Sequence, residues 1–278
     1  MTVAEAHEIG EQETGHDFGW SFEPWAVLPM LLVAWLYWTG SRRIGGTADR
    51  RVSHLLFWTG LVSIALALTS PLHELGEHLF SAHMVEHEIL MVAGVPLLVA
   101  ARPAAILMAG MPHWARLVTI AAIHHGAVKK LWSGGTELFS ATVLHTGVLW
   151  LWHVPVLFQA ANENEGVHVI QHLSFIVSAL LFWTAILDRD RKRHDQGLAA
   201  LALFFTSLQA SLLGALITFS SRLWYPAGPD PEAIAGLSRF EDQQLAGLIM
   251  WVPACTLYIV AAILILARWF SRLEVRHG

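Results

Sequence analysis

Histidines at helical spacing are the residues of this sequence with the clearest capacity for chemistry. The chain has 16 histidines, an excess that no generic feature of its composition explains. His83 and His87 are four residues apart with Glu86 beside them, and His168 and His172 repeat that spacing. Side chains at i and i+4 are neighbours on an α-helix, so each pair can place two imidazoles on one metal ion.

Other polar residues extend this set. His145 and His153 are eight residues apart, as are Asp242 and Met250, which puts each pair near one face of a helix. His145 lies about two helical turns deeper than His153. The predicted metal ligands are His78, His83, Glu86, His87, His145, His153, His168, His172, Asp242 and Met250.

These ligand types narrow the choice of metal without selecting one. Imidazole suits zinc, copper, iron and nickel, and a thioether favours Cu(I). Two histidines on different helices, such as His145 and His172, can instead be the axial ligands of haem b. The H-x-x-E-H spacing around Glu86 also matches a zinc-protease motif, in which the histidines bind zinc and the glutamate activates water. A metal transporter is a further reading of the same residues.

The elements that must position these residues are membrane-spanning helices. Hydrophobic residues make up 55% of the 278-residue chain and charged residues 14%, whereas a soluble domain has about 25% charged residues. A spanning helix needs about 20 mostly apolar residues. The qualifying segments are 24–40, 53–70, 82–101, 137–153, 167–187, 198–220 and 243–267. We therefore predict an all-α polytopic membrane protein, with a bundle of seven transmembrane helices over residues 24–270.

The basic residues predict the orientation of this bundle. Fifteen of the 17 Lys and Arg residues fall in four segments that alternate with four nearly devoid of them. By the positive-inside rule the basic side is cytoplasmic, so the N-terminus lies outside and the C-terminus in the cytoplasm. Residues 1–23 then form an acidic extracytoplasmic tail and residues 271–278 a cytoplasmic tail. The predicted ligands fall in the outer half, and short interfacial helices are expected at 71–80, 104–110 and 114–123.

Four stretches of the sequence carry a likeness to a known family. They are Ser70-Pro71-Leu72 with His83-Met84-Val85-Glu86-His87 and residues 96–103; His145 with Trp150-Leu151-Trp152-His153-Val154-Pro155; Gln171-His172-Leu173-Ser174-Phe175 with Phe182-Trp183; and residues 242–251. In these stretches, over about residues 70–270, the chain resembles the CtaG-type cytochrome c oxidase assembly factors, membrane proteins named for a caa-type oxidase.

The resemblance implies a non-enzymatic role in maturing a haem-copper oxidase. The chain would be a metallochaperone of the bacterial plasma (inner) membrane that binds copper in the outer half of its bundle. It would deliver that copper to an oxidase subunit, with a periplasmic copper chaperone as a further partner. Membrane lipid is an expected partner and nucleic acid is not, and homodimerisation is left open. A single-pass copper chaperone that shares the name uses cysteine ligands, which this chain with its one cysteine cannot match.

Overall fold

The computed structural model describes residues 19–44, 50–187, 193–226 and 231–274. Every regular element of these residues is helical, and no strand occurs among them. The predicted tails at 1–23 and 271–278 lie largely outside the described residues.

Each of the seven predicted apolar segments forms a helix. Their ends differ from the predicted ones by a few residues, mostly by extension. The long helices are α1 (Pro24–Ile44), α2 (Arg51–Thr69), the continuous run of α4 (Phe80–Glu88), η2 (Ile89–Gly94) and α5 (Val95–Ala101), then α9 (Leu138–Trp152), α11 (Glu165–Ile186), α12 (Arg193–Thr218) and α14 (Arg239–Glu274). The segment η2 is π-helical, a local widening that is rare and often found near functional sites.

Five of these helices are long and apolar enough to cross a membrane. They span 51–69, 80–101, 165–186, 196–218 and 239–271. A sixth candidate combines α9 with α10 (Pro155–Glu163), which are bent by 73° at the break between them. The prediction of an all-helical membrane protein is therefore confirmed, while the count of seven spans and the orientation stay predictions.

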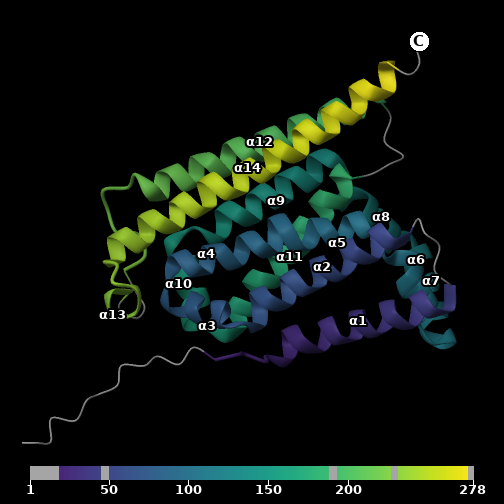
Figure 1. Ribbon diagram of the computed structural model, residues 1–278, viewed down its shortest axis with the longest axis horizontal. Helices are drawn as coiled ribbons and strands as arrows, with labels where there is room; N and C mark the ends of the chain where they lie inside the picture. The colour runs from purple at the N-terminus through teal and green to yellow at the C-terminus, as the bar shows by residue number, and fades with distance from the viewer. Residues whose placement is uncertain (1–18, 45–49, 188–192, 227–230, 275–278) are drawn as a thin grey trace, which may run out of the picture.

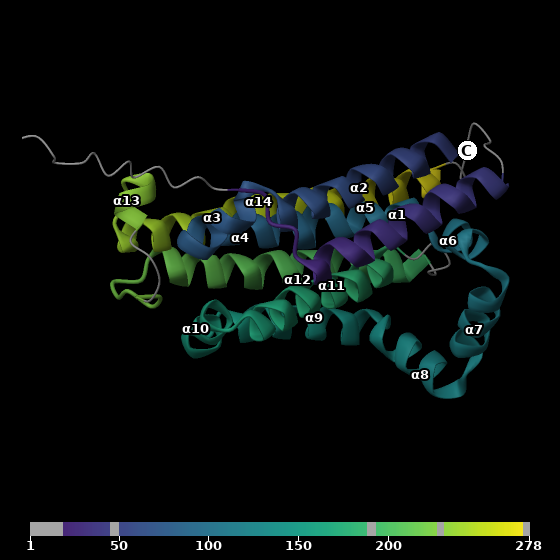
Figure 2. The same ribbon diagram turned by 90° about the horizontal axis from the view of Figure 1, so that it is seen from below.

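The long helices lie side by side in one bundle, with short helices at its two ends (Figure 1). At one end are α3 (Pro71–His78), α10 and α13 (Pro231–Ala235). At the other are α6 (Ala104–Gly110), α7 (His113–His124) and α8 (Gly126–Gly135). In Figure 2, α7 and α8 project away from the bundle, and neither has a buried residue. The short helices expected at 71–80, 104–110 and 114–123 are thus present as α3, α6 and α7.

The most extensive helix pairing among the described residues joins α12 to α14, which run together along one side of the bundle (Figure 1). Gly214 and Gly247 make this approach possible. A Cβ atom added to Gly214 would lie 2.8 Å from the carbonyl oxygen of Gly247, and the reverse distance is 2.7 Å. Small residues let backbones of membrane helices pack at short range, so this pair holds α14 in place against α12.

Candidate metal centre

The start of α4 is held by a residue from the far end of the chain. Leu79 occupies the N-cap position of α4 and has no side-chain cap to offer. Asp242 of α14 supplies it instead, accepting from the backbone N–H groups of Phe80 at 2.8 Å and Ser81 at 3.1 Å, and from the Ser81 hydroxyl. The first N–H groups of a helix lack intrahelical partners, so this carboxylate both caps α4 and ties it to α14.

The short helix α3 folds back onto α4. Ser70 caps α3 by accepting from the N–H of Leu72 at 3.3 Å, and Pro71 occupies its first turn. Leu79 has an extended backbone, with φ −119° and ψ 122°, which breaks the helix and reverses its direction. Gly76 allows close packing, since a Cβ there would lie 3.3 Å from both the Cα of His83 and Oε2 of Glu86. The fold-back carries His73 to the carboxylate of Glu86.

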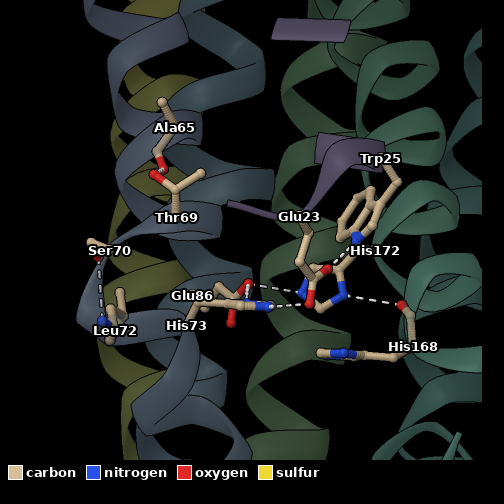
Figure 3. A network of polar contacts seen from close by, with 10 residues as sticks. All are labelled: Glu23, Trp25, Ala65, Thr69, Ser70, Leu72, His73, Glu86, His168 and His172. Carbon is tan, nitrogen blue, oxygen red and sulfur yellow. Dashed lines mark hydrogen bonds and ion pairs between the residues drawn. The ribbon is translucent and has the colours of Figure 1, made fainter. Parts of the chain in front are cut away.

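Glu86 is the centre of the resulting site and is fully buried. Its Oε1 lies 2.9 Å from Nδ1 of His73 on α3 and 2.9 Å from Nε2 of His172 on α11 (Figure 3). One ligand atom from each of these three residues lies within 4.8 Å of the other two, close enough to share one metal ion. Side chains from the adjacent helix α3 and from the distant helix α11 therefore converge on a single carboxylate of α4.

Three more histidines, His83, His87 and His168, complete what we call the histidine cluster, namely His73, His83, His87, His168 and His172 around Glu86. The ring centroids of His83 and His87 are 4.2 Å apart, and those of His168 and His172 are 4.4 Å apart. The two pairs meet, with 5.0 Å between the rings of His87 and His172 and 5.7 Å between those of His83 and His168. Both i, i+4 pairs singled out in the sequence thus face each other across α4 and α11.

Several polar atoms of the cluster are buried without a hydrogen-bond partner. They are Nε2 of His73, Nε2 of His83, both ring nitrogens of His87, Nε2 of His168 and Oε2 of Glu86. A buried polar group without a partner costs about 1–3 kcal/mol, and native proteins keep few of them. Five imidazole nitrogens and a carboxylate oxygen are a donor set that suits copper or zinc. The residues therefore fit a bound metal ion.

Backbone carbonyls orient two of the imidazoles. Nδ1 of His172 donates to the carbonyl oxygen of His168 at 3.1 Å, and Nδ1 of His153 donates to that of Leu149 at 2.7 Å. Each contact leaves Nε2 as the nitrogen that can ligate, which is the usual outer-shell arrangement for metal-binding histidines. Nε2 of His153 lies 3.4 Å from the sulfur of Met84, so a thioether and an imidazole adjoin the cluster.

His73 shows the electrostatic character of the centre. Burial lowers the pKa of its imidazole, but the hydrogen bond to Glu86 and the negative charges of Glu86, Glu23 and Glu77 outweigh burial. The net effect is a pKa raised above the ordinary histidine value. This end of the bundle therefore favours positive charge.

A known protein family matches the part of the chain that contains this centre. Residues 32–272 match the family model of the cytochrome c oxidase caa3 assembly factors, Caa3_CtaG. The chain belongs to this family. The matched region contains the whole histidine cluster, and it agrees with the likeness read from the sequence motifs.

One curated protein is similar in sequence to the chain but has no described function. An uncharacterised protein of Mycobacterium leprae (strain TN) is 25% identical to the chain over 242 residues, covering 82% of the chain. The chain spans 35% of that relative's length. No solved structure matches the chain.

The remaining predicted ligands lie outside the cluster. His145 has both ring nitrogens engaged, Nδ1 with Ser178 at 3.3 Å and Nε2 with Tyr258 at 3.0 Å. Met250 is buried in the hydrophobic core. Asp242 is the cap of α4 described above, and Nδ1 of His78 donates to the carbonyl oxygen of Glu74 at 2.9 Å.

Two residues of the site were not among the predicted ligands. His73 lies in the segment 71–80 that was expected to form a short interfacial helix, but nothing in its spacing connects it to Glu86, 13 residues away. Met84 lies within the recognised motif between the two histidines of α4, yet its contact with His153 is made across 69 residues. The signal that could have identified Met84 is its thioether sulfur, which lies between the predicted ligands His83 and His87 in the sequence.

Proposed function

We propose that this caa3 assembly factor binds a copper ion in the histidine cluster and passes it to an oxidase subunit during assembly. The observation that supports the proposal most directly is the group of buried, unpartnered nitrogens on His83, His87 and His168 beside Glu86. A metal ion would provide the missing partner for these atoms. The family's role in oxidase assembly makes copper, a metal of the haem-copper oxidases, the relevant cargo.

Charge balance favours Cu(I) over Cu(II) in this site. Glu86 is the one carboxylate inside the cluster, so Cu(I) would give a neutral pair and Cu(II) a net positive charge. An unbalanced charge in a low-dielectric interior is costly. The thioether of Met84 beside His153 also favours Cu(I), because sulfur ligands prefer this oxidation state.

The number of donors suits an ion that must leave again. Five imidazoles exceed the four positions of a tetrahedral ion, so the ion can exchange one nitrogen for another without losing its coordination. Such exchange lowers the barrier to handing the ion on. A delivery protein needs this property, whereas a permanent structural site does not.

Two of the other readings of the sequence, a zinc protease and a haem b protein, receive less support from the contacts. In a zinc protease the glutamate must reach water, but Oε1 of Glu86 is engaged by both His73 and His172, and its unpartnered Oε2 is buried away from solvent. For haem b, His145 would need a free nitrogen, but both are hydrogen-bonded to Ser178 and Tyr258. Copper binding requires only Glu86 and the unpartnered imidazole nitrogens in the positions that they already occupy.

The test is copper binding and oxidase maturation in a double variant, His83→Ala with His87→Ala. The matched control is His124→Ala with His125→Ala, which removes two exposed histidines at the opposite end of the bundle. We expect the purified wild type and the control to hold copper against a chelator of known affinity, and the cluster variant to lose it. In cells at limiting copper, the cluster variant should give low oxidase activity that excess copper partly restores. Full oxidase activity at limiting copper, with the variant present at normal levels, would refute the delivery role.

A further inference from the structure

A cavity of about 310 Å³ opens beside the histidine cluster, at the end of the bundle where α3 and α10 lie. It is lined by four carboxylates, Glu23, Glu77, Glu163 and Glu165, and by the imidazoles of His83 and His168. No Lys or Arg is among the described residues that line it. Four carboxylates without a basic residue give the cavity a negative potential that attracts cations.

The cavity reaches the cluster through two of the cluster's own histidines. His83 is only 2% exposed, and its Nε2 is buried without a hydrogen-bond partner. Nε2 of His168 is also unpartnered. Because both imidazoles line the cavity, it provides a path from solvent to the buried nitrogens.

A second group of ligand atoms lies at this cavity. One ligand atom each from Glu23, His73 and Glu77 lies within 4.8 Å of the other two. Nε2 of His73 is buried and unpartnered, 3.9 Å from Oε1 of Glu23 (Figure 3). Nδ1 of the same ring contacts Glu86, so His73 presents one nitrogen to the inner centre and the other to this outer group.

The residues of the outer group are held in place. Glu77 follows His73 by four residues on α3 and therefore lies on the same face of that helix. Glu23 precedes α1 and accepts a hydrogen bond from the indole N–H of Trp25. The indole ring lies 6.0 Å from the imidazole of His172, so the same side chain adjoins the inner centre.

We infer that Glu23, His73 and Glu77 form a second cation site, which loads the histidine cluster from the acidic cavity. The inference rests on the proposed function for the role of the site, although the site itself needs only these three residues. Carboxylate oxygens hold soft Cu(I) less strongly than imidazoles do, so an ion captured here passes favourably inward. Nε2 of His83 and Nε2 of His168 are the next donors along the cavity.

The kinetic test compares two double variants that remove the same charge. Glu23→Gln with Glu77→Gln neutralises the outer group, and Glu163→Gln with Glu165→Gln neutralises the other two carboxylates of the cavity. Copper loading is followed by loss of colour from a Cu(I)–chelator complex. We expect the first variant to load at least about tenfold more slowly than wild type, and the control pair to slow loading much less. Equal loading rates for the first variant and wild type would overturn the inference and leave the copper proposal standing.

A binding test separates the outer site from the inner one. In the His83→Ala, His87→Ala variant, the probe is Co²⁺ alone, followed by its absorption spectrum. We expect one Co²⁺ to bind and to be lost when Glu23→Gln and Glu77→Gln are added. If wild type takes up no copper but this Co²⁺ site persists, the copper proposal fails and the outer site stands. If no Co²⁺ binds, the outer site is refuted; Glu77→Gln alone, at an exposed position, repeats the test should the double variant fail to fold.

Discussion

Removing the Asp242 carboxylate should destabilise the start of α4 and so disturb the metal centre indirectly. Asp242 is 3% exposed and accepts hydrogen bonds from the N–H groups of Phe80 and Ser81 and from the Ser81 hydroxyl. A hydrogen bond to a charged group contributes about 1.5–3 kcal/mol. The three contacts share one carboxylate and are not additive, so we expect Asp242→Ala to lower the free energy of unfolding by about 3 kcal/mol.

The Asp242→Asn variant distinguishes a cap from a metal ligand. Its amide oxygen can still accept from Ser81, while the amide nitrogen cannot accept from Phe80. We expect a loss of about 1–2 kcal/mol, in the range of a single capping contact, with the copper content unchanged. If Asp242 were instead a ligand or a charge partner of the ion, the Asp242→Asn protein would lose copper.

The assay measures thermal unfolding and copper content of the same purified samples in detergent. Asp242→Ala should show the lower unfolding temperature and a reduced copper content, because the first turn of α4 precedes His83 directly. Asp242→Asn should unfold between this variant and wild type and keep its copper. Loss of copper from Asp242→Asn at an unchanged unfolding temperature would refute the capping argument and restore Asp242 as a ligand.

Three further predictions concern proton competition, helix packing and topology. Copper binding should weaken as the pH falls through about 6.5, because neutral imidazole is the ligand form; the raised pKa of His73 means that protons compete at that residue from a higher pH. A competition titration against a chelator at several pH values measures this, and pH-independent affinity would contradict it. Gly214→Ala should lower the unfolding temperature, because the added Cβ would lie 2.8 Å from a backbone oxygen of α14. The control is Gly147→Ala, which should be neutral or slightly stabilising because no atom lies within 4 Å of the added Cβ. A C-terminal alkaline phosphatase fusion should be inactive and one in the 221–242 loop active, as the 15-to-2 asymmetry of basic residues predicts; the opposite pattern would reverse the orientation.

Local periodicity accounts for what could be predicted about the fold. Each apolar segment is long enough to form a helix by itself, and the backbone of a lipid-embedded segment must satisfy its own hydrogen bonds. The seven helices and the three short ones were therefore predictable to within a few residues. The helix α8 was not predicted, because residues 126–135 contain three glycines and are too short and too mixed in polarity to show a buried face, and none of them is buried.

The pairing of histidines within a helix was also a property of the sequence. The i, i+4 spacing places His83 beside His87 and His168 beside His172 in any α-helix, and the structure has both pairs. The family likeness followed from the motifs in the same way, since it depends on residue order alone.

Tertiary structure decided which of these side chains meet. Helical phase gives the direction of a side chain but not the helix that it faces, so the sequence could not decide which of His145, His153 and Asp242 meets the histidine pairs. In the structure His145 pairs with Tyr258 and Asp242 caps α4, whereas His73 reaches Glu86. Two tertiary contacts determine this arrangement: α3 folds back onto α4 at Leu79, and α11 packs against α4. Both bring together residues whose spacing in the sequence does not predict that they meet.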